Sequence, residues 1–241
     1  MRVIVTRPCQ SGRRTAEKLR QRGHDPVILP LTAPTHDVLA AARALKQPYS
    51  AIAVTSAEAI RALEKLEEGL EPHRDALLFG VGRVTAAAAQ AAGFTRAQAA
   101  EGTGLDLADR ILAHFRETGP PQEPLLYLAG RPRSPALERT LSAAGLPYRT
   151  VECYHMLPIE HAPERLHRLL VETPVEAVLF YSRETVDRFF SLNPFMDGFA
   201  ALAQTRFYCL SRNIAAAVPA AMSERVRIAP SPDEEALLDL L

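Results

Sequence analysis

The sequence predicts an α/β protein with two similar domains, each a parallel β-sheet flanked by helices. Short runs of β-branched and leucine residues alternate with stretches of helical period, which is the pattern of repeated strand–helix–strand units. The same order of units occurs twice along the chain. At 241 residues, of which 47% are hydrophobic, the chain is long enough to fill two such domains.

The first unit covers roughly residues 1–30 and returns at 125–154. We expect strand, helix and strand at 3–5, 12–22 and 27–29, and again at 125–128, 135–144 and 148–154. Gly23 and Gly145 follow the two helices, as expected of a residue that ends a helix in the left-handed conformation. One β–α–β unit is therefore used twice.

A second unit also occurs twice, and each copy has a strand that ends in hydroxyl residues before a helix. In the first copy we expect a strand at 51–56, a helix at 57–66, a strand at 77–82 and a helix from 83. In the second copy we expect a strand at 178–182, a helix at 184–190, a strand at 207–211 and a helix at 212–216. Ser56 and Ser182 lie 126 residues apart, and Gly82 and Ser211 lie 129 apart, so the offset is nearly constant. Each copy is expected to close with a short apolar strand and a terminal helix, at 105–115 and at 233–241.

The order of the units allows two domain organisations. Each domain could consist of consecutive units, or the first unit could complete the domain of the last, which interleaves the domains. Residues 31–36 and 153–160 both look extended, and the interleaved arrangement needs two such connections. A helix over 37–46 would begin the second domain. The pattern of elements leaves both organisations open.

Bulk composition excludes several classes of function. The formal net charge is zero, so no strong field attracts nucleic acid or an anionic membrane. No apolar run approaches 18 residues, and the start of the chain has no apolar signal segment. Three separated cysteines and seven scattered histidines fit neither a disulfide framework nor a metal site. We expect a cytoplasmic protein that holds no metal ion.

Polar residues gather where the predicted strands end, and most stand beside an arginine. Carboxyl ends of parallel strands share one edge of a sheet, and free N–H groups and guanidinium groups there suit carboxylates. A single Ser, Thr or Asn is more simply a helix cap, which contributes about 1 kcal/mol. The repetition in both halves predicts a cleft for a polyanion. The strand ends are Thr6-Arg7, Thr55-Ser56, Gly82-Arg83-Thr85, Gly130-Arg131, Ser182-Arg183 and Ser211-Arg212-Asn213.

Tyr154 is the candidate catalytic residue. It lies on an extended stretch that stops at Pro158, at a proposed connection between domains. Packing is the commoner role of a tyrosine in a strand, but this location favours a functional one. Cys153 should pack on the opposite face, because consecutive residues of a strand alternate.

Gly80-x-Gly82-x-x-Thr85 resembles a dinucleotide-binding fingerprint without its third glycine. The first glycine falls inside the predicted strand rather than at its turn. This match is too weak to predict nucleotide binding. A nucleotide-dependent oxidoreductase or transferase remains an alternative.

The order of these pieces resembles the uroporphyrinogen-III synthase family across nearly the whole chain. The motifs are Val5-Thr6-Arg7-Pro8, Val54-Thr55-Ser56 with Ile60, Val81-Gly82-x-x-Thr85-Ala86, Tyr127-Leu128-x-Gly130, Leu141-x-x-x-Gly145, Val151-x-x-Tyr154 and Phe180-x-Ser182. The resemblance implies the interleaved topology, with one discontinuous domain of residues 1–33 and 163–241 and a second of 37–150. Two extended antiparallel linkers, at about 31–36 and 151–162, would join them.

The resemblance also implies a reaction. Linear hydroxymethylbilane would be cyclised to uroporphyrinogen III, with inversion of ring D and loss of water, by a hydro-lyase without metal or organic cofactor. We expect a monomer that binds this small molecule, binds no nucleic acid or membrane, and makes transient contact with the upstream bilane-forming enzyme. The alternative from another class is a two-lobe small-molecule binding or sensor protein.

Site residues follow from the resemblance and from the strand ends together. Tyr154 matches the proposed proton donor of the family, and Ser56, Thr85 and Ser182 match hydroxyls that line the cleft. The strand ends add further substrate-binding candidates, namely Thr6, Arg7, Gly82, Arg83, Gly130, Arg131, Arg183, Ser211 and Asn213. Ser211-Arg212-Asn213-Ile214 departs from the usual Gly-x-x-Thr, so no threonine role is carried over. Glu58, unusual beside an anionic ligand, is expected to point into solvent.

Overall fold

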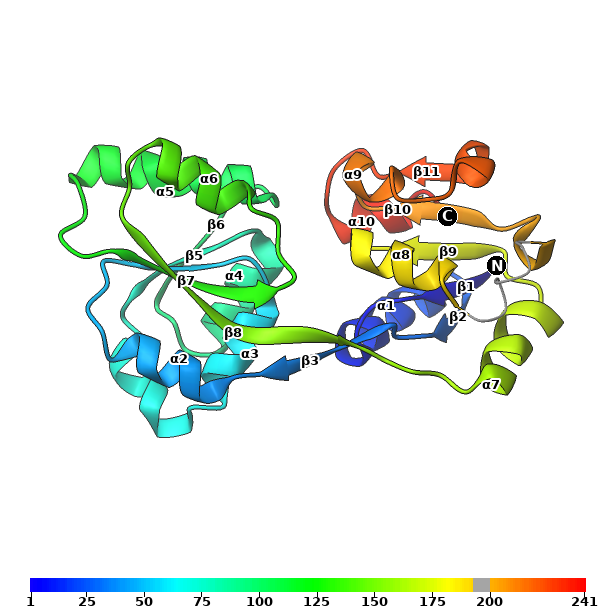
Figure 1. Cartoon of the computed structure of the whole chain (residues 1–241), viewed down its shortest axis with the longest axis horizontal. Helices are drawn as coiled ribbons and strands as arrows, with labels where there is room; N and C mark the ends of the chain where they lie inside the picture. Colours follow the sequence, from blue (N-terminus) through cyan, green and yellow to red (C-terminus); the bar gives the residue numbers. More distant parts are fainter. Residues whose placement is uncertain (193–199) are drawn as a thin grey trace. The chain divides into compact units, whose positions relative to one another are not determined.

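The computed structural model describes residues 1–192 and 200–241. The chain forms two compact units (Figure 1). Unit 1 consists of Met1–Ala33 and Leu157–Leu241, and unit 2 of Pro34–Met156. The N-terminal β–α–β segment therefore belongs with the C-terminal segment, and the interleaved topology is confirmed.

Unit 1 is built on a five-stranded parallel sheet with the order β11-β10-β9-β1-β2. Its strands are β1 (Arg2–Val5), β2 (Asp25–Ile28), β9 (Ala177–Phe180), β10 (Arg206–Cys209) and β11 (Val226–Ile228). Its helices are α1 (Cys9–Gln21), α7 (Pro163–His167), a π-helix (Arg168–Glu172), α8 (Arg183–Phe190), α9 (Arg212–Ala215), α10 (Glu234–Leu238) and 3₁₀ segments at Ala200–Leu202 and Ala220–Arg225. Buried apolar clusters lie on both faces of the sheet.

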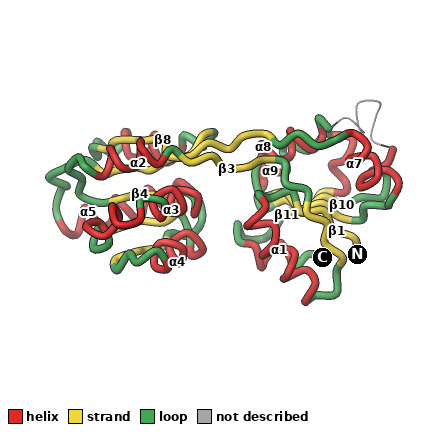
Figure 2. The backbone as a smooth tube through the Cα atoms, turned by 90° about the horizontal axis from the view of Figure 1, so that it is seen from below, coloured by secondary structure: helices red, strands yellow, loops and turns green. Residues whose placement is uncertain are grey.

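Unit 2 contains a six-stranded sheet with the order β3-β8-β7-β4-β5-β6. Its strands are β3 (Thr32–His36), β4 (Ile52–Val54), β5 (Leu77–Gly80), β6 (Arg96–Ala99), β7 (Leu125–Arg131) and β8 (Tyr148–Pro158). Strands β4 to β8 pair in parallel, and β3 lies beside β8 (Figure 2).

Helices cover both faces of the sheet of unit 2. One buried cluster contains residues of α2 (Val38–Leu45), α3 (Ala57–Glu64) and α4 (Arg83–Ala91). The other contains residues of α5 (Gly104–Thr118) and α6 (Ala136–Ala143). A 3₁₀ segment (Glu67–His73) follows α3. Because the central strands are buried on both faces, they read as continuous apolar runs in the sequence.

Local signals explain most element boundaries. Ser56 caps α3 by accepting a hydrogen bond from the backbone of Glu58, and Thr103 and Asp106 form a capping box on α5. Gly23 and Gly145 follow α1 and α6 with φ of +78° and +68°, as predicted. The short strand expected to be apolar in unit 2 is instead β6, a polar edge strand. Edge strands face solvent, so their sequence need not be apolar.

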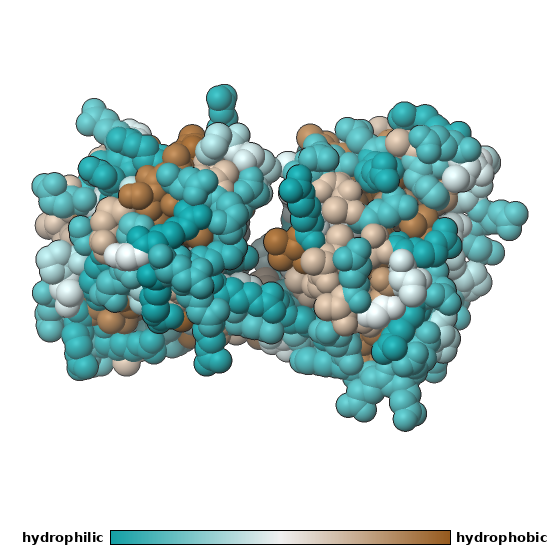
Figure 3. Space-filling view, turned by 180° about the vertical axis from the view of Figure 1, so that it is seen from behind, coloured by the Kyte–Doolittle hydropathy of each residue, from teal (hydrophilic) through white to brown (hydrophobic). Residues whose placement is uncertain are grey.

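The surface is mixed in character. Figure 3 shows a face on which hydrophilic side chains predominate and apolar side chains form separate patches. Among the described residues, none of the helices combines the length and the hydropathy that spanning a membrane requires.

Candidate active site

The parallel sheet of unit 2 brings four predicted strand ends to one edge. The neighbouring strands β8, β7, β4 and β5 place Tyr154, Gly130, Ser56 and Gly82 there. Val54 is in register with Leu128, so Ser56 and Gly130, two residues further along, end at the same level. Gly130 is in turn paired with Tyr154. Unit 2 therefore holds the candidate proton donor and three of its predicted neighbours together.

A β-bulge sets the direction of Tyr154. Ala129 pairs with Glu152, but the next residue, Gly130, pairs with Tyr154, which leaves Cys153 as an extra residue in β8. Cys153 and Tyr154 are both buried in the same apolar cluster. The prediction that they lie on opposite faces is wrong, because a bulge interrupts the alternation of a strand.

The ring of Tyr154 occupies the space that a side chain at position 130 would need. A Cβ atom built on Gly130 would lie less than 3.0 Å from Cζ, Cε2 and Oη of Tyr154. The absence of a side chain thus lets the ring cross β7 toward Ser56 at the end of β4. Only 7% of Tyr154 is exposed.

The surroundings keep the phenol of Tyr154 protonated. Burial raises the pKa of Tyr154 well above its ordinary value, and the nearby groups Tyr127, Cys153 and Glu58 add to this shift. The nearby Ser56 side chain acts in the opposite direction and lowers the pKa of Tyr154. The group is therefore an O–H donor throughout the neutral pH range, which a general acid requires.

Glu58 lies inside unit 2 rather than in solvent. It is 7% exposed, and its carboxylate pairs with the guanidinium of Arg61 and lies 3.1 Å from Nε2 of His36. The prediction that Glu58 points into solvent is wrong, because these two partners replace the water that a carboxylate otherwise needs.

The N-terminus of α4 adds groups suited to an anion. Thr85 is 6% exposed, and its hydroxyl makes no hydrogen bond to any part of the chain that the structure describes. Arg83 is exposed there. Gly82 has an extended backbone conformation. A Cβ atom built on Gly80 would lie 3.0 Å from the backbone nitrogen of Ala86, so close packing between β5 and α4 explains the glycine at this position. The first N–H groups of a nine-residue helix attract carboxylates.

Arg131 stands at the end of β7 with an exposed side chain. It is 69% exposed, and its guanidinium is 4.0 Å from the Glu152 carboxylate. Arg133 pairs more closely with Glu152 and with Glu138, at 2.7 Å and 3.1 Å. Arg131 is therefore available to an external carboxylate, whereas Arg133 serves the structure of unit 2.

The matching edge of unit 1 is only partly available to a ligand. The Thr6 hydroxyl is fully buried and donates to the backbone carbonyl of Leu179 at 2.8 Å. Ser182 caps α8 by accepting from the backbone N–H of Thr185 at 3.2 Å. Ser211 precedes α9 without capping it, and Arg183 and Asn213 are exposed.

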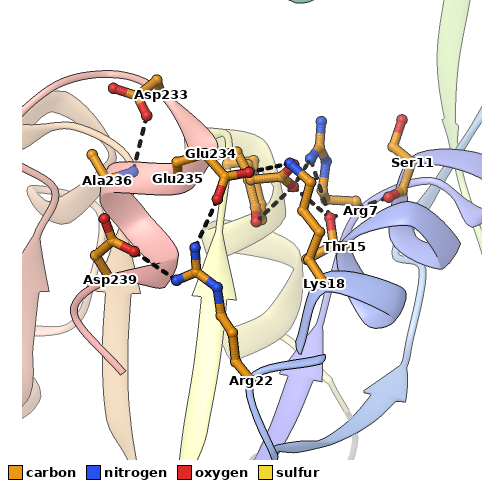
Figure 4. Close-up of polar contacts among 11 residues, drawn as sticks. Arg7, Ser11, Thr15, Lys18, Arg22, Asp233, Glu234, Glu235, Ala236 and Asp239 are labelled. Carbon is orange, nitrogen blue, oxygen red and sulfur yellow. Dashed lines mark hydrogen bonds and ion pairs between the residues drawn. The ribbon is translucent and has the colours of Figure 1, made fainter. Parts of the chain in front are cut away.

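Arg7 is engaged by an internal carboxylate (Figure 4). Glu234 of α10 pairs with Arg7 and also accepts from Thr15 at 2.6 Å, Lys18 at 2.8 Å and Tyr181 at 3.2 Å. The Arg7 guanidinium lies over the Tyr181 ring, 4.2 Å from its centroid. This cluster ties α10 to β1 and α1, and it involves residues more than 200 positions apart that sequence analysis did not connect.

Comparisons with known proteins agree on one family. Residues 13–239 match a family model described as uroporphyrinogen-III synthase HemD. No curated protein sequence matches the chain. A uroporphyrinogen-III synthetase structure from Helicobacter pylori is similar with a TM-score of 0.65 at 17% identity, covering 100% of this chain and 98% of that one. A mutant uroporphyrinogen III synthase from Thermus thermophilus gives 0.58 at 22% identity, covering 100% and 96%. These two likenesses support the two-domain α/β fold.

Proposed function

The chain belongs to the uroporphyrinogen-III synthase HemD family, whose reaction closes hydroxymethylbilane to uroporphyrinogen III, and we propose that Tyr154 is the proton donor of this reaction. The hydroxyl of the hydroxymethyl group must leave as water, which needs a proton. The ring-D carbon that bears its substituents attacks the resulting azafulvene cation, and a spiro-pyrrolenine forms before ring D closes inverted. A pyrrole carbon loses a proton at closure, and this proton can restore the phenol.

One observation carries the proposal. The phenol of Tyr154 lies over Gly130 and beside Ser56, at the edge of the sheet where α3 and α4 begin. A buried hydroxyl that stays protonated, with the Ser56 side chain nearby, meets the geometric and acid–base needs of a general acid. The comparisons give no support to a binding or sensor protein without catalysis.

The carboxylate arms of the substrate are assigned to groups that remain available at the strand ends. These groups are Arg83, Thr85 and Arg131 in unit 2 and Arg183, Ser211 and Asn213 in unit 1. Guanidinium groups and free helix N–H groups bind carboxylates well, and the bilane carries eight of them. Thr6, Arg7 and Ser182 are committed to other parts of unit 1, so we assign them the role of holding the strand ends in place.

The proposal extends to the setting of the reaction. We expect a monomer that works in the cytoplasm and receives the bilane through transient contact with the enzyme that makes it. Holding the folded bilane for attack at the substituted carbon is the main task, because free bilane already cyclises without inversion.

The test is the rate of type III formation in Tyr154→Phe. We expect a loss of roughly 100-fold or more if the phenol transfers a proton. Tyr148→Phe is the matched control, since Tyr148 lies on the same strand and its hydroxyl bonds to Ser142 at 2.9 Å. A wild-type rate in Tyr154→Phe would assign Tyr154 to packing and refute the proposal.

A further inference from the structure

The hydroxyl of Thr55 stands at the end of β4 and has no part in the reaction described so far. Thr55 directly follows the last residue of this strand, and it is partly exposed. Its Oγ1 lies 3.0 Å from Oη of Tyr127, which belongs to the neighbouring strand β7. Tyr127 is only 1% exposed. A buried phenol is thus hydrogen-bonded to a residue that a ligand at the strand ends can reach.

The burial of Tyr127 fixes the direction of this hydrogen bond. A phenol carries one proton, and a buried O–H group without an acceptor costs free energy. Within the described part of the chain, Thr55 is the single hydrogen-bond partner of the Tyr127 hydroxyl. If Thr55 donated instead, the phenol proton would have no acceptor, because a side chain this deeply buried has almost no contact with solvent. Tyr127 therefore donates to Thr55, and the proton of the Thr55 hydroxyl is left for a different acceptor.

Arg131 lies on the same side of the sheet as Thr55. Ala53 and Tyr127 are in register on β4 and β7, and both belong to the apolar cluster that contains residues of α5 and α6. Side chains alternate along a strand, so Thr55 and Arg131, which lie two and four residues further on, project to that same face. Arg131 is 69% exposed and 4.0 Å from the Glu152 carboxylate, which is beyond hydrogen-bond distance. Neighbouring strands therefore end in a hydroxyl and a guanidinium that both have donors to offer.

We infer that Thr55 binds a carboxylate arm of the substrate, with its hydroxyl held by Tyr127 and the same arm paired with Arg131. A carboxylate has two acceptor oxygens, so it can take the hydroxyl proton on one and the guanidinium on the other. Tyr127 acts through Thr55 and is a positioning residue. The inference rests on the proposed function for the identity of the ligand. It extends the substrate site from the face of the sheet that carries Tyr154 to the opposite face.

Product binding tests the inference separately from catalysis, because ring closure leaves every carboxylate of the bilane in place. The Kd of uroporphyrinogen III is measured by calorimetry without oxygen, beside KM and kcat with hydroxymethylbilane. We expect Thr55→Val to raise Kd and KM roughly tenfold with kcat nearly unchanged, and Thr55→Ser to keep the wild-type values. Thr95→Val is the matched control, because the Thr95 hydroxyl bonds to Asp75 at 2.9 Å just before β6 begins, at the opposite edge of the same sheet. This control should bind the product as the wild type does.

Two double variants test the parts given to Tyr127 and Arg131. Tyr127→Phe alone should raise Kd about threefold, and it should add nothing to Thr55→Val, because the phenol acts only through that hydroxyl. Thr55→Val should cost less in the Arg131→Ala background than alone, because the shared arm has already lost one of its two partners. Effects that simply multiply in both pairs would overturn the shared binding of one carboxylate.

The outcomes also separate this inference from the proposed function. If Tyr154→Phe keeps the wild-type rate while Thr55→Val weakens product binding, the proton-donor role fails and the inference stands. A folded Thr55→Val variant with the wild-type Kd overturns the inference and leaves the role of Tyr154 untouched. Should Thr55→Val not fold by circular dichroism, Thr55→Ala is measured with the same expectation. A native chain that binds no uroporphyrinogen III refutes both.

Discussion

Replacing Gly130 by alanine tests the geometry of the candidate site most sharply. The new methyl group would lie less than 3.0 Å from three atoms of the Tyr154 side chain, namely Cζ and Cε2 of the ring and the phenolic Oη. The ring is not the loose end of a flexible side chain, because Tyr154 is 7% exposed and packs in the apolar cluster of unit 2. It must therefore shift as a body, away from the position that faces Ser56.

The size of the effect follows from this overlap. Carbon atoms in ordinary contact lie about 3.5–4.0 Å apart, so the ring must move by roughly 1 Å or more. Overpacking of this kind costs about 1–3 kcal/mol of folding stability. A catalytic group displaced by about 1 Å loses on the order of 100-fold in rate. We expect kcat to fall by about that factor, with little change in KM and a modest fall in Tm.

The assay is the initial rate of type III formation, together with thermal unfolding of the same preparation. Gly69→Ala is the control, because the nearest atom to its new methyl group would be Cβ of Leu66 at 3.7 Å, an ordinary contact. Adding Gly130→Ala to Tyr154→Phe should cost little further rate. A Gly130→Ala variant with wild-type kcat would refute the claim that the ring must lie over β7 to act.

Three further predictions concern charges and thiols. Arg83→Ala and Arg183→Ala should each raise KM several-fold with kcat nearly unchanged, because their exposed guanidinium groups would hold carboxylate arms of the substrate both before and during the reaction. Saturation curves that coincide with the wild-type curve would show that neither arginine belongs to the substrate site. Glu234→Gln should lower Tm at neutral pH: burial alone would raise the pKa of Glu234, but Arg7 and other donors outweigh it and hold that pKa below its ordinary value. The stabilisation is therefore present above the ordinary carboxyl pKa and disappears as the pH falls through the lower folded-state pKa, so a Tm difference that persists in strong acid would contradict it. In the folded chain a thiol reagent near neutral pH should label Cys9 alone, since burial raises the pKa of the other two thiols to about 12; a second label would be inconsistent.

Sequence patterns predicted the strands, the helices and the repeated units because that information is local, whereas the choice between the two domain organisations came from the family resemblance. Each buried strand is a short apolar run, and most of the longer helices have a side-chain cap or a terminal glycine. The parallel order then dictates that strand ends share an edge, which is why Ser56 and Gly130 could be grouped before their contacts were known. Tyr154 was added to them through its place on the proposed connection and through the family resemblance. The near-constant offset between the two halves identified the repeat.

The details that direct the chemistry depend on pairing between distant segments. The bulge at Cys153 results from the register in which β7 pairs with β8, so no local sequence pattern predicts it. Glu58 looked like an ordinary exposed residue of a first helical turn, because His36, its partner, belongs to another element. Arg7 looked free because Glu234, which engages it, lies 227 residues away. Such ion pairs arise from tertiary packing, and sequence spacing does not reveal them.

The isomer ratio of the macrocycle made from hydroxymethylbilane tests the central claim most directly. Purified protein is mixed with the linear bilane, and the type I and type III products are separated. We expect type III to dominate with the native chain, and the type I share to grow in Tyr154→Phe as uncatalysed closure overtakes the slowed enzyme. Type I product alone from the native chain would contradict the assigned reaction and the role given to Tyr154.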